Sequence, residues 1–73
     1  MAKRLNLKSL RVKLGLTQTA MAKKFGVGLT TYISIENGKN DGKLSFWKAI
    51  QQDQNLTGDE LCELQKIQQI QES

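Results

Sequence analysis

The chain has 73 residues, and its eleven Lys and Arg residues outnumber seven Asp and Glu residues to give a formal net charge of +4 at neutral pH. This length allows one small domain. The absence of histidine excludes a His-based catalytic or zinc site. The single Cys62 argues against a disulfide framework and fits a reducing, intracellular setting. No apolar run approaches the roughly 18 residues of a membrane span and no signal segment opens the chain, so we expect a complete, cytoplasmic protein that has no cofactor, no metal ion and no enzymatic activity.

The first predicted helix begins near Asn6, a residue type that favours the N-cap of a helix. Its apolar residues fall on one face at helical spacing and are Leu7, Leu10 and Leu14. Gly15 then ends the helix. Residues 1–5 are predicted to be a frayed basic arm, which either reaches a nucleic-acid phosphate or contacts nothing.

The segment 17–38 is predicted to fold as two short helices joined by a tight turn at Gly26. Thr17 can cap the first of these helices, and Met21 and Phe25 stand four residues apart and therefore share its inner face. Gly26 gives the backbone the freedom to reverse direction after that helix. The inner face of the second helix, near residues 28–36, is formed by Val27, Ile35 and either Thr31 or Tyr32. Two helices joined by a short turn that contains glycine form a helix-turn-helix unit.

A fourth helix is predicted from about Leu44 to Asp53, after an exit loop that begins at Asn37. Its apolar side is formed by Phe46, Trp47 and Ile50, with Leu44 at its start. We expect Trp47 to lie in the core rather than to stack on a nucleic-acid base.

A fifth helix is predicted at about residues 58–70, where Thr57 and Glu60 have the spacing of a capping box. Its apolar stripe consists of Leu61, Leu64, Ile67 and either Gln68 or Ile70. An extended amphipathic helix of this kind is suited to pair with a second copy in a homodimer; the alternative is that it packs against the first helix.

One pattern of fixed offsets runs through the first three predicted helices. It comprises Leu10, Arg11, Gly15, Leu16, Thr17, Gln18, Ala22, Gly26 and Val27, and it continues without a gap in Ile35, Glu36, Asn37, Gly38 and Lys39. This joint pattern, which is far more specific than a piece such as GLTQ, resembles the Cro/repressor-type helix-turn-helix regulators of phages and bacteria over about residues 5–61. The resemblance implies an all-α fold, a compact bundle of about five short helices like the phage repressor DNA-binding domains, in a single domain over residues 1–73.

The resemblance also implies roles for three polar residues. It pairs Arg11 with Glu36 in a partly buried ion pair between the first and third helices, where two separate surface charges are the alternative. It places Gln18 on a DNA phosphate and against the first residue of the third helix, where simple exposure to solvent is the alternative. A glutamine side chain can make both contacts because its amide donates while its carbonyl accepts.

The third helix corresponds in this family to the recognition helix, whose N-terminal residues enter the major groove of DNA. Its outward positions are Leu29, Thr30, Ile33 and Ser34. None of them is the Arg, Lys, Asn or Gln that usually reads base edges, and Gly28 replaces the usual Ser or Thr cap. The face can contact thymine methyl groups, with one hydrogen bond from Ser34, or Leu29 and Ile33 can bind another protein. A third interpretation rotates the helix, so that Ile33 is in the core and Tyr32 faces outward.

The resemblance assigns residues of the exit loop to the phosphate backbone. Asn37 and Lys39 match family positions of this kind, and Lys43 is a further candidate. Asp41 opposes this role, and Gly42 replaces a proline common in the family, which predicts a more mobile loop. The full set of predicted DNA contacts is Thr17, Gln18, Leu29, Thr30, Thr31, Ile33, Ser34, Asn37, Lys39 and Lys43.

The charge distribution favours a polyanionic partner. Ten of the eleven basic residues lie within residues 1–48, where only Glu36 and Asp41 oppose them. Charge alone fits a solvated surface equally well, but together with the helix-turn-helix pattern it favours double-stranded DNA. The sequence thus predicts a homodimeric transcription regulator, a repressor of the kind common in phages and other mobile elements, that inserts its third helix in the major groove. The alternative is a modulator of the same fold that binds another regulator protein through Leu29 and Ile33.

Overall fold

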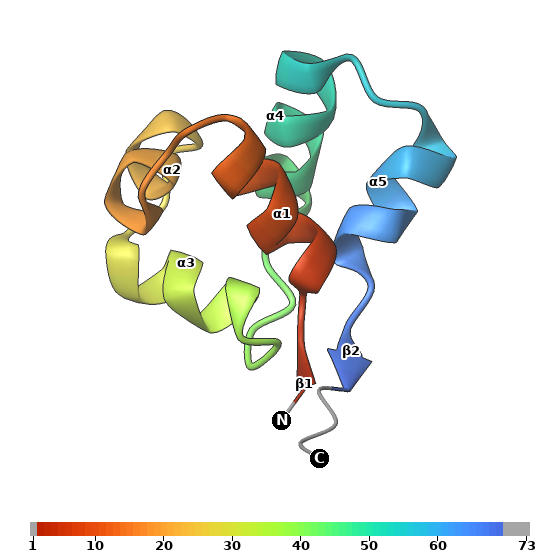
Figure 1. Ribbon diagram of the computed structural model, residues 1–73. Coiled ribbons are helices and arrows are strands. Elements are labelled where there is room, and N and C mark those ends of the chain that lie inside the picture. The colour runs from red at the N-terminus through yellow and green to blue at the C-terminus, as the bar shows by residue number, and fades with distance from the viewer. Residues whose placement is uncertain (1, 70–73) are drawn as a thin grey trace.

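The computed structural model describes residues 2–69, in which five helices and two short strands follow one another along the chain (Figure 1). They are β1 (Ala2–Lys3), α1 (Leu5–Lys13), α2 (Gln18–Lys24), α3 (Leu29–Glu36), α4 (Leu44–Gln54), α5 (Gly58–Gln65) and β2 (Gln68–Gln69). The two strands pair antiparallel and bring the ends of the described chain together. The fold is therefore the all-α bundle that the sequence predicted, with one small β-ribbon added. No helix within residues 2–69 is long and apolar enough to cross a membrane.

The hydrophobic core receives at least one buried side chain from each of these helices. Its members are Leu7, Met21, Ala22, Phe25, Tyr32, Ile35, Phe46, Trp47, Ile50 and Leu64. Phe46 of α4 stands at the centre of the aromatic residues. Its ring centroid lies 6.2 Å from that of Phe25, 6.2 Å from that of Tyr32 and 5.0 Å from that of Trp47, each pair edge to face. Such pairs stabilise a core beyond their buried area, so one ring of α4 holds α2 and α3 together.

The helix-turn-helix unit forms where the sequence predicted it. Thr17 caps α2, since its Oγ1 accepts a hydrogen bond from the N–H of Ala20 at 3.1 Å. Gly26 has a φ of +71°, the left-handed conformation that lets the chain reverse direction between α2 and α3. A Cβ at Gly26 would meet no atom within 4 Å, so the backbone angle rather than crowding requires glycine there.

The capping box of α5 is confirmed, but the helix is shorter than the predicted range of about 58–70. Thr57 and Glu60 exchange hydrogen bonds at 3.1 and 3.2 Å, and α5 then ends at Gln65. Lys66 is extended, with φ −65° and ψ 129°, because the chain leaves the helix to form β2 against β1. Ile67 is consequently exposed beyond the helix, and Ile70 lies outside the described residues.

The α5 helix is shorter than the extended helix from which the sequence predicted a dimer surface. It packs along α1, and Leu64 is buried there. Asn6, which the sequence predicted as the N-cap of the first helix, lies inside α1 and donates from Nδ2 to the carbonyl oxygen of Glu63 at 2.9 Å. The alternative interpretation, packing of the fifth helix on the first, is therefore the one observed.

The prediction of a frayed N-terminal arm is wrong. β1 pairs with β2, and the backbone N–H of Arg4 donates to the carbonyl oxygen of Glu36 at the end of α3, at 2.9 Å. Arg4 is only 3% exposed, and its guanidinium donates to backbone carbonyl groups of three other segments. Basic composition suggested a solvated arm, but these distant acceptors hold Arg4 inside the fold.

Two expectations about the start of α4 are also corrected. Leu44 is exposed, because it is the first residue of the helix and precedes the face that reaches the core. Gly42 does not loosen the loop before α4: it has a φ of +78°, and a Cβ there would lie 2.9 Å from Nε1 of the buried Trp47. Glycine is required at this position both by the backbone angle and by the close approach of the indole.

Gly26 and Gly42 provide a paired test of crowding. Both have φ near the left-handed region, but only Gly42 is packed against a buried ring. We expect Gly26→Ala to lower the free energy of unfolding by about 1 kcal/mol, the cost of the backbone angle alone. Gly42→Ala should cost at least about 1 kcal/mol more, because Trp47 must shift and its indole hydrogen bond must lengthen. Urea denaturation of both variants measures this difference, and equal losses would contradict the role given to the contact.

Candidate nucleic-acid interface

Helix α3 lies at the surface with one face buried and the opposite face open (Figure 1). Tyr32, Ile35 and Glu36 form the buried face, and Tyr32 is 0% exposed. The interpretation in which Tyr32 faces outward is therefore wrong, and of the two candidates for the inner face it is Tyr32, not Thr31, that lies in the core.

The outer face of α3 consists of residues that the sequence predicted to contact DNA. Leu29 is 41% exposed, Thr30 and Thr31 are also exposed, and Ile33 and Ser34 are half-buried. Gly28 stands at the N-cap and gives no side-chain acceptor to the first turn. The open surface at the start of α3 thus combines apolar side chains, hydroxyl groups and backbone N–H groups without a side-chain cap.

The far end of α3 is held by an ionic contact to the rest of the unit. Arg11 Nε of α1 donates to Glu36 Oε2 at 3.1 Å, the pair that the family resemblance implied, and its Nη1 donates to the carbonyl oxygen of Leu16 at 3.0 Å. Glu36 is only 4% exposed. A buried carboxylate without a cation would be strongly destabilising, so this pair fixes α3 relative to α1.

Gln18, at the start of α2, joins this contact from the other side. Its Nε2 donates to Glu36 Oε1 at 3.4 Å, so the side chain contacts the last residue of α3. The resemblance had implied a contact with the first residue of that helix. The amide carries two N–H groups, and the second one can still donate to a phosphate oxygen. Thr17 beside it is exposed, and its hydroxyl oxygen is engaged as the cap of α2.

The Tyr32 hydroxyl lies buried beside this ionic contact. It has no hydrogen-bond partner among the described residues. Burial of the ring, followed by the nearby Glu36 carboxylate, raises the pKa of Tyr32 above its ordinary value. The hydroxyl is therefore neutral in the folded protein at neutral pH.

The predicted phosphate contacts of the exit loop follow α3 directly in the chain. Lys39 and Lys43 are exposed, Asn37 is half-buried, and neither lysine has an acidic partner within residues 2–69. Asp41, which the sequence marked as unfavourable, is fully exposed but lies 3.7 Å from Nη2 of Arg4. Its charge is thus partly offset by a buried cation.

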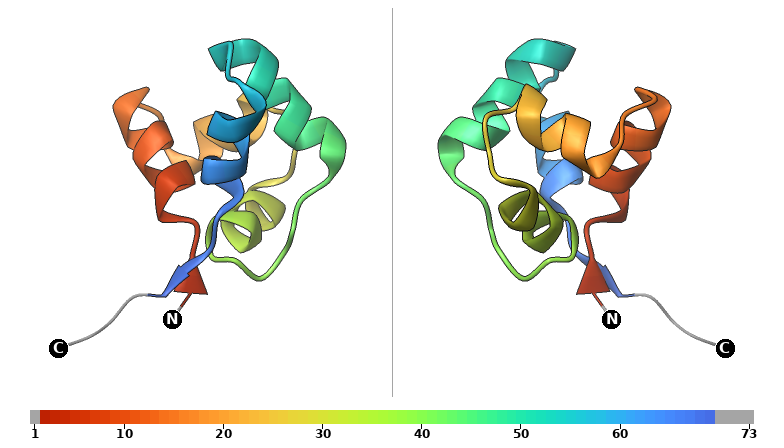
Figure 2. Two further views of the ribbon diagram at one scale, coloured as in Figure 1. Left: turned by 90° about the vertical axis from the view of Figure 1, so that its right-hand side faces the viewer. Right: turned by 90° about the vertical axis from the view of Figure 1, so that its left-hand side faces the viewer.

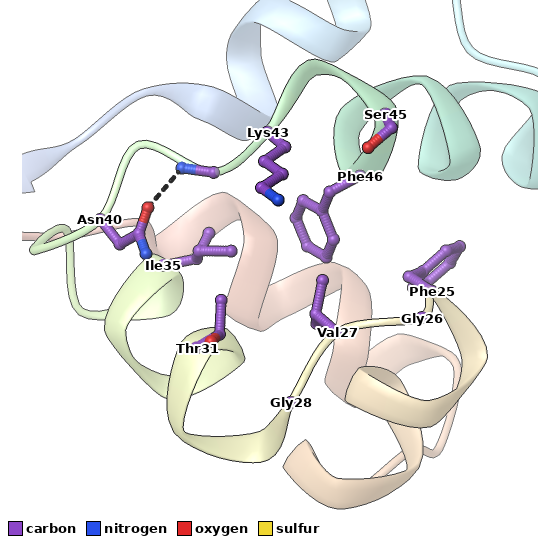
Figure 3. A pocket seen from close by; sticks show the side chains of 11 residues that line it. Phe25, Gly26, Val27, Gly28, Thr31, Ile35, Asn40, Lys43, Ser45 and Phe46 are labelled. Carbon is purple, nitrogen blue, oxygen red and sulfur yellow. Dashed lines mark hydrogen bonds between the residues drawn. The ribbon is translucent and has the colours of Figure 1, made fainter.

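An open pocket of ≈ 490 Å³ separates the beginning of α4 from the inner flank of α3 (Figure 3). Val27, Ile35 and Phe46 give it apolar walls, and the Lys43 side chain points into it between Ile35 and Phe46. The pocket leaves room beside the Lys43 side chain, while the neighbouring Gly42 approaches α3 closely: a Cβ at Gly42 would lie 3.4 Å from Cδ1 of Ile35.

The single tyrosine of the chain allows a direct test of this buried environment. The folded-state pKa of Tyr32 is raised, so its contribution to stability is complete below the unfolded pKa of about 10 and is lost as the pH rises above that value. Tyr32→Phe should be within about 1 kcal/mol of the wild type at neutral pH, because the hydroxyl has no partner to lose. Above pH 10 the variant should unfold less readily than the wild type.

Near-ultraviolet absorbance follows ionisation of Tyr32 directly, since no other tyrosine contributes. Tyr32 should ionise only when the protein unfolds. Ionisation near pH 10 in protein that is still folded would contradict the buried position.

A family model described as helix-turn-helix matches residues 7–60, which is more than half of the chain and includes all of α2, α3 and α4. Neither the curated proteins nor the solved structures gave a match to this chain. The matched span contains the Gly26 turn, the exposed α3 and the contact between Arg11 and Glu36. The chain therefore belongs to the Cro/repressor-type helix-turn-helix family, whose members are DNA-binding transcription regulators.

Proposed function

We propose that this protein is a repressor that binds a specific double-stranded DNA site with α3 in the major groove. The observation that carries the proposal is the position of α3: its outer face is open at the surface, while its inner face and its C-terminal end are held by the core and by Arg11. A helix in the major groove needs this arrangement, because its outer side chains must reach base edges without leaving the fold.

The chemistry of the outer face suggests which bases it reads. Leu29 and Ile33 present methyl groups that suit the C5-methyl group of thymine. Thr30 and Ser34 carry hydroxyl groups that can donate to or accept from several base edges, so they discriminate less. The proposed site therefore has thymines at the positions beneath Leu29 and Ile33.

Phosphate contacts would supply most of the affinity. Lys39 and Lys43 have no acidic partner within the described residues, and Gln18 keeps one amide N–H available. Each phosphate that is neutralised releases counterions and contributes about 0.9 to the slope of log affinity against log salt concentration. The proposed complex is therefore strongly salt-dependent.

Two copies would bind neighbouring half-sites. Half-sites on one face of the duplex are about 34 Å apart, and the two shorter dimensions of the molecule are 26 and 23 Å. Two copies can thus stand side by side on one face without overlap. The contact between them is not supplied by an extended C-terminal helix, since α5 ends at Gln65.

A second candidate function rests on the apolar part of the same face. Leu29 is exposed and Ile33 is partly exposed one turn further along, which gives α3 a short apolar stripe. In this alternative the stripe binds another regulator protein, and DNA binding is not its role.

Selection from a random duplex pool tests the DNA-binding function. Purified protein should enrich one sequence motif, and its affinity should fall steeply with salt. Lys39→Ala should lower the salt slope by about 1 and weaken binding to all duplexes alike, because it removes a phosphate contact. Lys8→Ala, at an exposed position of α1, is the matched control and should leave the slope unchanged. If the selection enriches no motif and the affinity does not depend on salt, the proposal is wrong.

Leu29→Asp separates the two candidate functions. A carboxylate facing the bases should weaken specific DNA binding at least about 100-fold through repulsion and the loss of an apolar contact. Val12→Asp, at an exposed apolar position on α1, controls for the added charge. If Leu29→Asp leaves DNA binding intact and instead abolishes a complex with another regulator, the modulator function is the correct one.

A further inference from the structure

Arg4 makes contacts that neither the sequence pattern nor the family resemblance suggested. Its Nη1 donates to the carbonyl oxygens of Ile35 at 2.6 Å and Asn40 at 2.8 Å. Its Nε donates to the carbonyl oxygen of Gln65 at 3.0 Å. One buried guanidinium thus joins the end of α3, the loop between α3 and α4, and the end of α5. Burial lowers the pKa of Arg4, with Asp41 opposing the shift, but an arginine remains charged in proteins at neutral pH.

Trp47 holds the same loop next to Arg4. Its Nε1 donates to the carbonyl oxygen of Asp41 at 2.8 Å, and the Arg4 guanidinium lies over the indole ring at 5.4 Å. Consecutive carbonyl groups of the loop are therefore held from inside, Asn40 by Arg4 and Asp41 by Trp47. We call Arg4 and Trp47 the loop clamp.

The first half of the loop is also tied directly to α3, because the N–H groups of Lys39 and Asn40 bond to the carbonyl oxygen of Ser34 in that helix. The N–H of Gly42 bonds to Oδ1 of Asn40, which shapes the loop locally. The open pocket lies between the second half of the loop and α3 (Figure 3). The loop clamp is thus the polar connection that holds Asn40 and Asp41 to the core, in addition to the bonds to Ser34.

The clamp lies on the inside of the segment that presents the candidate phosphate contacts. Lys39 and Lys43 flank Asn40 and Asp41 in the chain, and both are exposed. Figure 2 shows this loop and the β-ribbon at the same end of the bundle, beside α3. Lys39 is held to α3 by its own N–H bond to Ser34, so a shift of the two clamped carbonyl groups would chiefly move Lys43 relative to the outer face of α3.

We propose that Arg4 is a positioning residue for DNA binding, which holds the exit loop at a fixed distance from α3 so that both meet one duplex together. This inference rests on the proposed DNA-binding function. Lysine cannot replace Arg4 here, since a single ammonium group cannot offer the planar fork of donors or stack on Trp47 in the same way. The loop of an Arg4→Lys protein is therefore expected to be displaced or mobile.

The test compares the salt dependence of DNA affinity in clamp variants, using the duplex selected by the wild-type protein. Arg4→Lys should bind about tenfold more weakly and should lose about 1 from the salt slope, because the phosphate contact of Lys43 is lost. Trp47→Phe keeps a ring beneath Arg4 but removes the indole donor, and it should lower the slope in the same direction. If Arg4→Lys does not fold, the salt slope of Trp47→Phe tests the inference, and an unchanged slope would contradict it.

A destabilised control separates positioning from stability. Leu61→Ala shortens a partly buried side chain of α5 that packs against the hydrophobic core and takes no part in the hydrogen bonds of the loop clamp. It should lower the free energy of unfolding but keep the wild-type salt slope, when all proteins are compared at a temperature where circular dichroism shows each to be folded. A lower slope in Leu61→Ala as well would overturn the inference, since any loss of stability would then suffice.

A double-mutant cycle gives the sharpest outcome. Lys43→Ala should weaken binding about fivefold in the wild-type background but less than about twofold in Arg4→Lys, because a displaced loop has already lost that contact. Additive effects, or wild-type affinity and slope in a folded Arg4→Lys protein, would overturn the inference. Absence of salt-dependent binding in the wild type is a different result, which would remove the proposed function and the inference with it.

Discussion

The arrangement of this molecule depends on how the C-terminal end of α3 is held. The helix has eight residues, and helices of this length are only marginally stable alone in water. Two arginines converge on its last turn: Arg11 pairs with the Glu36 carboxylate, while Arg4 bonds through its side chain to the carbonyl oxygen of Ile35 and through its backbone to that of Glu36. Cations suit this end of a helix, where carbonyl groups lack partners. With its C-terminal end fixed, α3 can leave its N-terminal end free at the surface.

Much of the fold follows from local chemistry that a sequence displays. Thr17 accepts a hydrogen bond from a residue only three positions further along the chain, and Thr57 and Glu60 cap α5 within one turn. Gly26 adopts a left-handed backbone angle that depends on that residue alone. Such features depend on near neighbours and can be predicted residue by residue. The contact between Arg11 and Glu36 spans 25 residues and was predicted only because the family resemblance pairs these positions.

The errors arose where distant parts of the chain compete with a local pattern. Arg4 looked like part of a solvated basic arm, but its acceptors lie 31, 36 and 61 residues away. Apolar residues at helical spacing beyond Leu64 predicted a longer α5, yet pairing of β1 with β2 draws that segment out of the helix. Gly42 suggested a mobile loop, whereas the indole of Trp47 occupies the space that a side chain would need. None of these outcomes can be predicted from the residue and its near neighbours in the sequence.

The composition of the outer face makes rigid placement of α3 more important in the proposed complex. A bidentate side chain such as arginine tolerates small shifts, because its long stem can follow the base, whereas Leu29, Thr30 and Ser34 are short. Dispersion contacts to a thymine methyl group weaken when a gap of even half an ångström opens. A face that reads DNA through methyl and hydroxyl groups therefore needs its helix and its phosphate contacts held in one fixed relation. The two arginines at the end of α3, together with Trp47 beneath the exit loop, connect these two parts through the core.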